Sequence, residues 1–116
     1  MGEMSDTSST WHRDALSKLS EILRRDADVL AVVLTGSMAD PKVVVDRWSD
    51  VDLKIVIEDP AVDRYVQSID WLLPFGRLIG MERHKGPFSY TLRLCFESYR
   101  RFDLSFLCVS AIADGA

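Results

Sequence analysis

Cysteine and histidine, two residue types that often bind transition metals, are scarce in this chain. Its 116 residues include two cysteines and two histidines. Cys95 and Cys108 lie within or beside apolar segments and lack the spacing of metal ligands, so we interpret both as small core residues. His12 falls on an expected helix and His84 in an expected loop, and neither is a candidate ligand.

Long apolar runs and an excess of positive charge are also missing. No apolar run approaches the roughly 18 residues that a membrane-spanning helix needs, and the polar N-terminus lacks the apolar segment of a secretory signal. The formal net charge of −4 argues against a general nucleic-acid surface. We therefore expect a cytoplasmic protein that binds neither a membrane nor a nucleic-acid polymer.

The apolar periodicity predicts one α+β domain, of a length that can bury a single core. Residues 1–10 are small and polar and are expected to form a flexible tail, which leaves residues 11–116 for the domain. Thr10 is suited to cap a helix whose apolar residues repeat at helical spacing and should pack on a sheet. Pro60 is expected in the first turn of a second helix, over about 60–72.

The strand signals predict a mixed sheet of about four to five strands. Val29–Thr35 is a continuous apolar run, which favours a central strand, and Val51–Ile57 forms the next strand. Residues 88–96 alternate between apolar and polar side chains, and a hairpin should join them to a strand at 102–107. Three cationic residues are expected in a solvated loop, namely Arg77, Arg83 and Lys85.

Three aspartates are the main candidates for chemistry. Asp50 and Asp52 open a predicted strand, and because successive strand side chains alternate, both lie on the face opposite to its apolar residues. Asp103 also faces away from an apolar row, so it can join the pair if the two strands are neighbours. Mg²⁺ is usually held by one or two carboxylates plus substrate phosphates. The pattern therefore predicts a site for metal ions that carry a nucleoside triphosphate, as in two-metal phosphoryl transfer.

A glycine and a serine supply the expected phosphate contacts. Gly36 follows an apolar strand and lets the backbone turn tightly and approach a phosphate with its N–H groups. Ser37 adds a hydroxyl donor and is expected to open a short helix whose N-terminus favours an anion. Arg93 projects from the face opposite to the aromatic row of its strand, where it can reach the triphosphate. A solvent-exposed cation without this role is an equally good interpretation.

Each of these features also has a simpler explanation. A Gly-Ser turn occurs in any soluble domain. An Asp-x-Asp pair at the start of a strand is more often a solvated edge or a turn cap, and Asp103 can be the ion-pair partner of Arg100 or Arg101. The order of the features is more informative than any one of them: a strand, Gly-Ser, a strand with Asp-x-Asp, and a later strand with a single acid.

These residues resemble the nucleotidyltransferase superfamily with the polymerase-beta-like core, and within it the aminoglycoside 6-adenylyltransferases, the streptomycin-modifying group. The resemblance implies the nucleotidyltransferase fold and extends over about residues 29–107. It is carried by four runs, AVVLTGS at 31–37, SDVDL at 49–53, DWLLPFG at 70–76 and RFDLSFL at 101–107.

The resemblance further implies an enzyme that transfers AMP from ATP to a hydroxyl of an aminoglycoside such as streptomycin, with Mg²⁺ as cofactor. By position, Asp50, Asp52 and Asp103 would be the catalytic and metal-binding residues, with Asp103 binding a second metal or helping to deprotonate the acceptor. Gly36 and Ser37 would hold the triphosphate.

The chain also departs from that family. We expect it to lack the C-terminal helical domain that completes the acceptor pocket. Met38 stands where a basic residue usually follows Gly-Ser, and Glu97-Ser98 replaces an expected Asp-Gly turn. Two other functions stay open: an antitoxin-type nucleotidyltransferase fold acting with a helical partner protein, and a non-catalytic nucleotide-binding domain. The sequence also leaves open whether the chain forms a homodimer that fills the cleft.

Overall fold

The computed structural model describes residues 3–40, 42 and 49–110 of the chain. No helix in this described part is long and apolar enough to cross a membrane. Short 3₁₀ segments connect several of the main elements, and two of them, η1 (Gly36–Ala39) and η3 (Asp70–Phe75), are used below. The main elements are α1 (Glu3–Arg24), β1 (Val29–Thr35), β2 (Val51–Ile57), α2 (Val62–Val66), β3 (Leu78–Lys85), β4 (Ser89–Phe96) and β5 (Arg100–Cys108).

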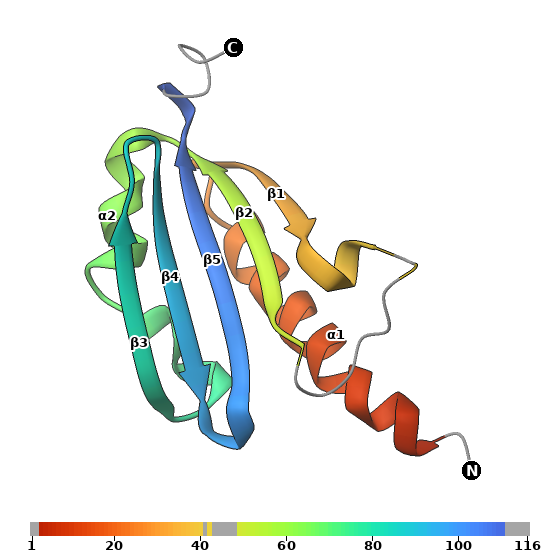
Figure 1. Ribbon diagram of the computed structural model, residues 1–116. Helices are drawn as coiled ribbons and strands as arrows, with labels where there is room; N and C mark the ends of the chain where they lie inside the picture. The colour runs from red at the N-terminus through yellow and green to blue at the C-terminus, as the bar shows by residue number, and fades with distance from the viewer. Residues whose placement is uncertain (1–2, 41, 43–48, 111–116) are drawn as a thin grey trace.

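The five strands form one mixed sheet in the order β1-β2-β5-β4-β3. β2 and β5 pair in parallel, and the other neighbouring strands are antiparallel. Both helices lie on the same side of the sheet, behind it in Figure 1. No described helix covers the opposite face, which is called the open face below. The predicted α+β fold with a mixed sheet of four to five strands is confirmed.

Alternation along the central strands decides which side chains form the core. On β2 the buried residues alternate with Asp52, Lys54 and Val56, which lie on the open face. β4 and β5 show the same alternation over most of their length. Each large apolar side chain buried in this way contributes about 1.5–3 kcal/mol. The fully buried members of the core are Leu19, Leu23, Val51, Leu53, Ile55, Ile57, Val66, Leu72, Leu92, Phe96, Leu104 and Phe106.

Aromatic rings attach α2 and η3 to the sheet. Tyr65 stacks on Phe106 with a centroid distance of 5.4 Å, and Trp71 meets the Tyr65 ring edge-on at 5.1 Å. The Trp71 indole N–H donates a hydrogen bond to the Tyr65 carbonyl at 3.0 Å. Phe75, at the end of η3, packs edge-on against Phe102 at 5.2 Å. Aromatic contacts of this kind add to the area that the rings bury, so they fix the connection between β2 and β3.

Two predicted elements differ at the N-terminal side. The first helix begins at Glu3 rather than near Thr10. Val29–Thr35 is an edge strand and not a central one, because β1 pairs with β2 alone among the described strands. Its continuous apolar run suggested burial on both faces, yet Leu30 and Val33 are about half exposed.

The middle of the chain also departs from the prediction. The expected helix over 60–72 is divided into η2 (Asp59–Ala61), α2 and η3. Arg83, His84 and Lys85 do not lie in a loop but on β3, the other edge strand. β3 is exposed along nearly its whole length, so it lacks the apolar alternation that identifies a half-buried strand.

A polar contact joins the end of α1 to α2. The Tyr65 hydroxyl donates a hydrogen bond to Asp26, and Arg64 Nη1 lies 3.1 Å from Asp26 Oδ2. The Asp28 N–H donates to Asp26 Oδ1 at 2.9 Å. The Tyr65 hydroxyl is the main reason that the pKa of Asp26 lies below its usual range, with smaller effects from the Asp28 N–H and Arg64. Ionised Asp26 therefore stabilises the fold.

We predict that Tyr65→Phe lowers the free energy of unfolding by about 1.5 kcal/mol at neutral pH, because a hydrogen bond to a charged acceptor is lost. Since the folded pKa of Asp26 is depressed, this stabilisation is present above the unfolded value near 3.9 and is lost as the pH falls through the folded value. Urea unfolding from about pH 7 down to about pH 3 should show the gap to the wild type narrowing. Tyr90→Phe is the control, because the Tyr90 hydroxyl has no hydrogen-bond partner among the described residues. Equal effects of the two variants would contradict the prediction.

Candidate active site

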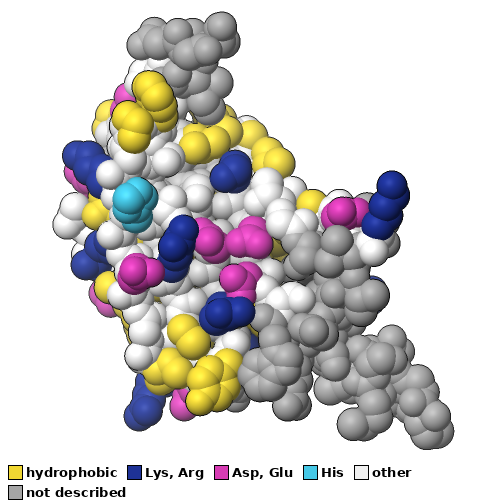
Figure 2. All heavy atoms as spheres, in the orientation of Figure 1, with side chains coloured by type: hydrophobic (Ala, Val, Ile, Leu, Met, Phe, Trp, Pro, Cys, Tyr) yellow, Lys and Arg dark blue, Asp and Glu magenta, His cyan; other side chains and the backbone are white. Residues whose placement is uncertain are grey.

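A row of polar residues crosses all five strands on the open face. The strand register pairs Thr35 with Asp52, Asp52 with Asp103, Asp103 with Arg93, and Arg93 with Glu82. Residues paired across neighbouring strands point to the same face, so the whole row lies opposite to the helices. Figure 2 shows acidic side chains gathered at the centre of this face, with basic side chains beside them. The strands of Asp52 and Asp103 are neighbours, which is the condition for the two residues to share a site.

Asp52 is the member of this row on β2, and it is partly buried. Burial is the main reason that its pKa is raised above the ordinary carboxyl value, and repulsion from Asp103 and Asp50 raises it further, while Lys54 opposes them. Like charges close to a partly desolvated carboxylate make its ionised form costly. A bound cation would remove this cost, so the electrostatics of the row fit a positively charged ligand.

Two arginines lie against the other two carboxylates. Arg101 Nε is 2.9 Å from Asp50 Oδ1, and Arg93 Nε is 3.6 Å from Asp103 Oδ2. The Arg101 contact is an ion pair without hydrogen-bond alignment, since Asp50 Oδ1 is a buried oxygen that receives no hydrogen bond. Asp103 forms its ion pair with Arg93, and not with Arg100 or Arg101 as the simpler explanation suggested.

Gly36 lies directly against the carboxylate of Asp52. Its φ of +74° belongs to the left-handed region, and a Cβ at this position would lie 2.1 Å from Asp52 Oδ2. Only glycine fits such a backbone without strain or collision. The Thr35 hydroxyl donates a hydrogen bond to the Asp52 carbonyl at 3.3 Å, which holds the end of β1 against β2. The turn predicted at Gly36 is thus present, and it opens η1.

The side chains of the site offer the oxygen ligands that a divalent cation prefers, but they are not arranged around one position. Asp50 offers a buried oxygen without a hydrogen bond, and Asp52 is repelled by two neighbouring carboxylates. Oxygen ligands of this kind suit Mg²⁺. As the side chains stand, however, no three His, Cys, Asp or Glu residues in the described ranges lie close enough together to hold one ion. The metal assignment of Asp50, Asp52 and Asp103 therefore stays a prediction.

The structure adds residues that the sequence did not suggest. Arg101 faces the site because it lies two positions before Asp103 on β5, and strand alternation is the signal that could have found it. His12 on α1 is fully buried, and its Nε2 donates to the Ser49 carbonyl at 2.7 Å, just before Asp50. No pattern in the sequence linked these two segments. For Ser37 the structure describes the backbone in η1 but not the side chain, so its hydroxyl contact stays a prediction.

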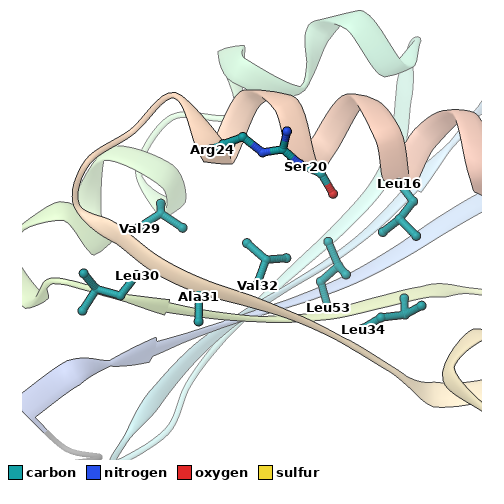
Figure 3. Close-up of a pocket in the computed structure, with 9 residues that line it drawn as sticks. All are labelled: Leu16, Ser20, Arg24, Val29, Leu30, Ala31, Val32, Leu34 and Leu53. Carbon is teal, nitrogen blue, oxygen red and sulfur yellow. The ribbon is translucent and has the colours of Figure 1, made fainter.

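A cleft of about 290 Å³ opens beside the polar row, and its lining includes Asp50, Arg93, Arg101 and Asp103. A larger hollow, of about 400 Å³, lies between α1 and β1 (Figure 3). Its lining is mostly aliphatic, with Ser20 and Arg24 as the polar members. Because it contains no carboxylate, the smaller cleft is the better candidate for metal and phosphate chemistry.

Two solved structures share the fold of this chain. A crystal structure of an aminoglycoside 6-adenyltransferase from Bacillus subtilis matches with a TM-score of 0.66 and 16% identity, over 90% of this chain and 37% of that chain. A cytoplasmic RNA terminal U-transferase matches with a TM-score of 0.58 and 21% identity, over 97% of this chain and 35% of that chain. These similarities define the nucleotidyltransferase fold, and the chain spans little more than a third of either structure.

The family follows from the sequence comparison. The model of the streptomycin adenylyltransferase family matches residues 12–115, and the chain belongs to this family. This confirms the resemblance inferred from the motifs. No curated protein sequence matches the chain significantly.

We predict that Asp52→Asn stabilises the metal-free protein at neutral pH. Because the folded pKa of Asp52 is raised, its ionised form destabilises the fold above that pKa, and the penalty disappears as the pH falls towards the unfolded value near 3.9. Thermal unfolding with a chelator present should show a midpoint higher by roughly 2–5 °C at about pH 7, and less at lower pH. Asp14→Asn, at an exposed position of α1, is the control and should give no such rise. A lower midpoint for Asp52→Asn would contradict the electrostatic account.

We predict that Gly36→Ala costs about 1–2 kcal/mol of stability and displaces the Asp52 carboxylate, because φ is positive and the new Cβ meets that carboxylate. Urea unfolding gives the first quantity, and NMR shifts of the Asp52 and Asp103 carboxyl carbons give the second. Gly86→Ala is the matched control, since its Cβ would have Ser89 Oγ at 3.5 Å as nearest atom. Equal losses in both variants would mean that the Gly36 turn has no special role.

Proposed function

We propose that the protein is a nucleotidyltransferase core that transfers AMP from ATP to a hydroxyl of an aminoglycoside such as streptomycin. The observation that carries this proposal is the position of Asp52 beside Asp103 on parallel strands, with the Gly36 turn against the Asp52 carboxylate. Membership of the streptomycin adenylyltransferase family supports the choice of reaction.

Asp50, Asp52 and Asp103 would hold Mg²⁺ on the open face. When bound, the metal neutralises charge on the phosphates and on the oxygens of an in-line displacement. The raised pKa of Asp52 and the buried, unbonded oxygen of Asp50 support this assignment, because both favour a cation.

The remaining groups would position the nucleotide and the acceptor. The backbone N–H groups at the Gly36 turn and the Ser37 hydroxyl would contact the triphosphate, and Arg93 would reach it from β4. The acceptor oxygen attacks the α-phosphorus of ATP, the bond to the bridging oxygen breaks, and pyrophosphate leaves. Asp103 would take up the proton of the acceptor hydroxyl, since it lines the cleft that Arg93 also lines.

The acceptor pocket requires more than these residues. An aminoglycoside carries several positive charges, and a protein with a formal net charge of −4 suits such an acceptor better than a polynucleotide. The chain corresponds to 37% of the aminoglycoside 6-adenyltransferase structure. We propose that residues outside this chain, from the same or a partner protein, complete the pocket.

Calorimetric titration with ATP, with and without Mg²⁺, tests the nucleotide half of the proposal. We expect the wild type to bind ATP only in the presence of Mg²⁺, and Asp52→Asn to weaken this binding by about tenfold or more. Even the loss of a residue that hydrogen-bonds to a metal ligand typically lowers metal affinity by about 10–100-fold. Asp14→Asn should bind like the wild type.

Two results would count against the proposal. The absence of ATP binding to a folded sample would exclude a working nucleotide site in this chain. Equal Mg²⁺-dependent affinity in the wild type and Asp52→Asn would remove Asp52 from the metal site. If binding is found, incubation of the chain with ATP, streptomycin and the proposed completing protein should release pyrophosphate.

A further inference from the structure

Two of the three carboxylates in the candidate site already have a cationic partner. Asp50 is paired with Arg101 and Asp103 with Arg93, and all four side chains line the same cleft. No arginine forms an ion pair with Asp52 in the described structure. The arginines therefore occupy the carboxylates that a metal ion would use.

The contact between Arg101 and Asp50 is close but not fully bonded. The two charged atoms are 2.9 Å apart, yet the oxygen receives no hydrogen bond. The Arg101 side chain is 55% exposed, and ion pairs at such exposure are weak. A divalent cation offers Asp50 twice the charge, so it can replace the guanidinium at small cost.

The cleft gives the displaced guanidinium another partner. A triphosphate in this cleft would carry oxygens beside both arginines, and guanidinium groups bind phosphate oxygens in pairs through their fixed fork of N–H donors. The Arg101 side chain can therefore pair with the Asp50 carboxylate before a nucleotide binds and with a phosphate oxygen afterwards.

We propose that Arg101 competes with the divalent ion for Asp50. Before the metal binds, its guanidinium pairs with Asp50, and after the metal has replaced it there, the guanidinium binds the triphosphate. This exchange rests on the proposed nucleotidyltransferase function. It explains why the three carboxylates do not lie close enough together to hold one ion. Asp50 lies against Arg101 and Asp103 against Arg93, and neither points towards a common metal position. Arg101 is thus a nucleotide-binding residue that also delays metal binding until the nucleotide is present.

The test is Arg101→Gln, followed in two separate titrations. Mn²⁺ alone, measured by the loss of its free electron paramagnetic resonance signal, should bind about two- to fivefold more tightly than to the wild type, because a competing ion pair of that strength is removed. ATP in the presence of Mg²⁺, measured by calorimetry, should bind several-fold more weakly. Opposite changes in the two affinities are the expected signature.

Arg100→Gln is the matched control, because it removes the same charge one residue away. Arg100 lies on the other side of β5, with its guanidinium 5.7 Å from the Trp11 ring centroid. It should leave both affinities close to the wild-type values. A general effect of net charge would shift Mn²⁺ binding in the two variants alike and would overturn the proposal.

The remaining outcomes separate this inference from the proposed function. Weaker binding of both Mn²⁺ and ATP in Arg101→Gln indicates a structural role and overturns the exchange. Unchanged affinities, or tighter Mn²⁺ binding with unchanged ATP affinity, also overturn it, since no transfer to phosphate then occurs. Absence of ATP binding to the wild type is a failure of the proposed function itself, and is recognised before any variant is compared.

Discussion

The parallel pairing of β2 with β5 is the constraint on which the rest of the structure depends. It sets Val51 opposite Phe102 and Asp52 opposite Asp103, so one register serves both faces of the sheet. A slip of one residue would turn Asp103 into the core and an apolar neighbour into solvent. Hydrophobic packing against α1 and α2 therefore holds two carboxylates side by side that would otherwise repel each other.

That repulsion is the physical signature of the site. On a stable surface, charges of opposite sign would be neighbours, whereas Asp52 is partly buried and is repelled by both Asp103 and Asp50. The arginines relieve Asp50 and Asp103, but Asp52 is not relieved by any ion pair among the described residues. Proteins often accept such local cost where a ligand is to be bound. The buried core makes the fold stable enough to accept this electrostatic cost. The hydrogen bond from buried His12 to the Ser49 carbonyl fixes the segment that carries Asp50.

The sequence was informative wherever the environment of a residue is local. Strict alternation identified β4 and β5, and the order of Gly-Ser, Asp-x-Asp and a later aspartate predicted the candidate site and identified the family. It failed where the environment depends on distant neighbours. β1 was expected in the centre because an apolar run does not reveal which strands flank it, and β3 was missed because an edge strand exposed on both faces loses its alternation. The helix expected over 60–72 ends at Val66, and the 3₁₀ segment η3 that follows packs Trp71 and Phe75 against the sheet.

By itself, the sequence determined the chemical groups of the candidate site, the strand faces on which they lie and the turn that only Gly36 can make. These properties follow from the period of a strand and the sterics of a single residue. Only the tertiary structure decided that β5 lies between β2 and β4, that Arg101 reaches Asp50 and Arg93 reaches Asp103, and that His12 supports the loop before Asp50. Those contacts join residues far apart along the chain or depend on side-chain direction, so they arise from packing and not from any local pattern.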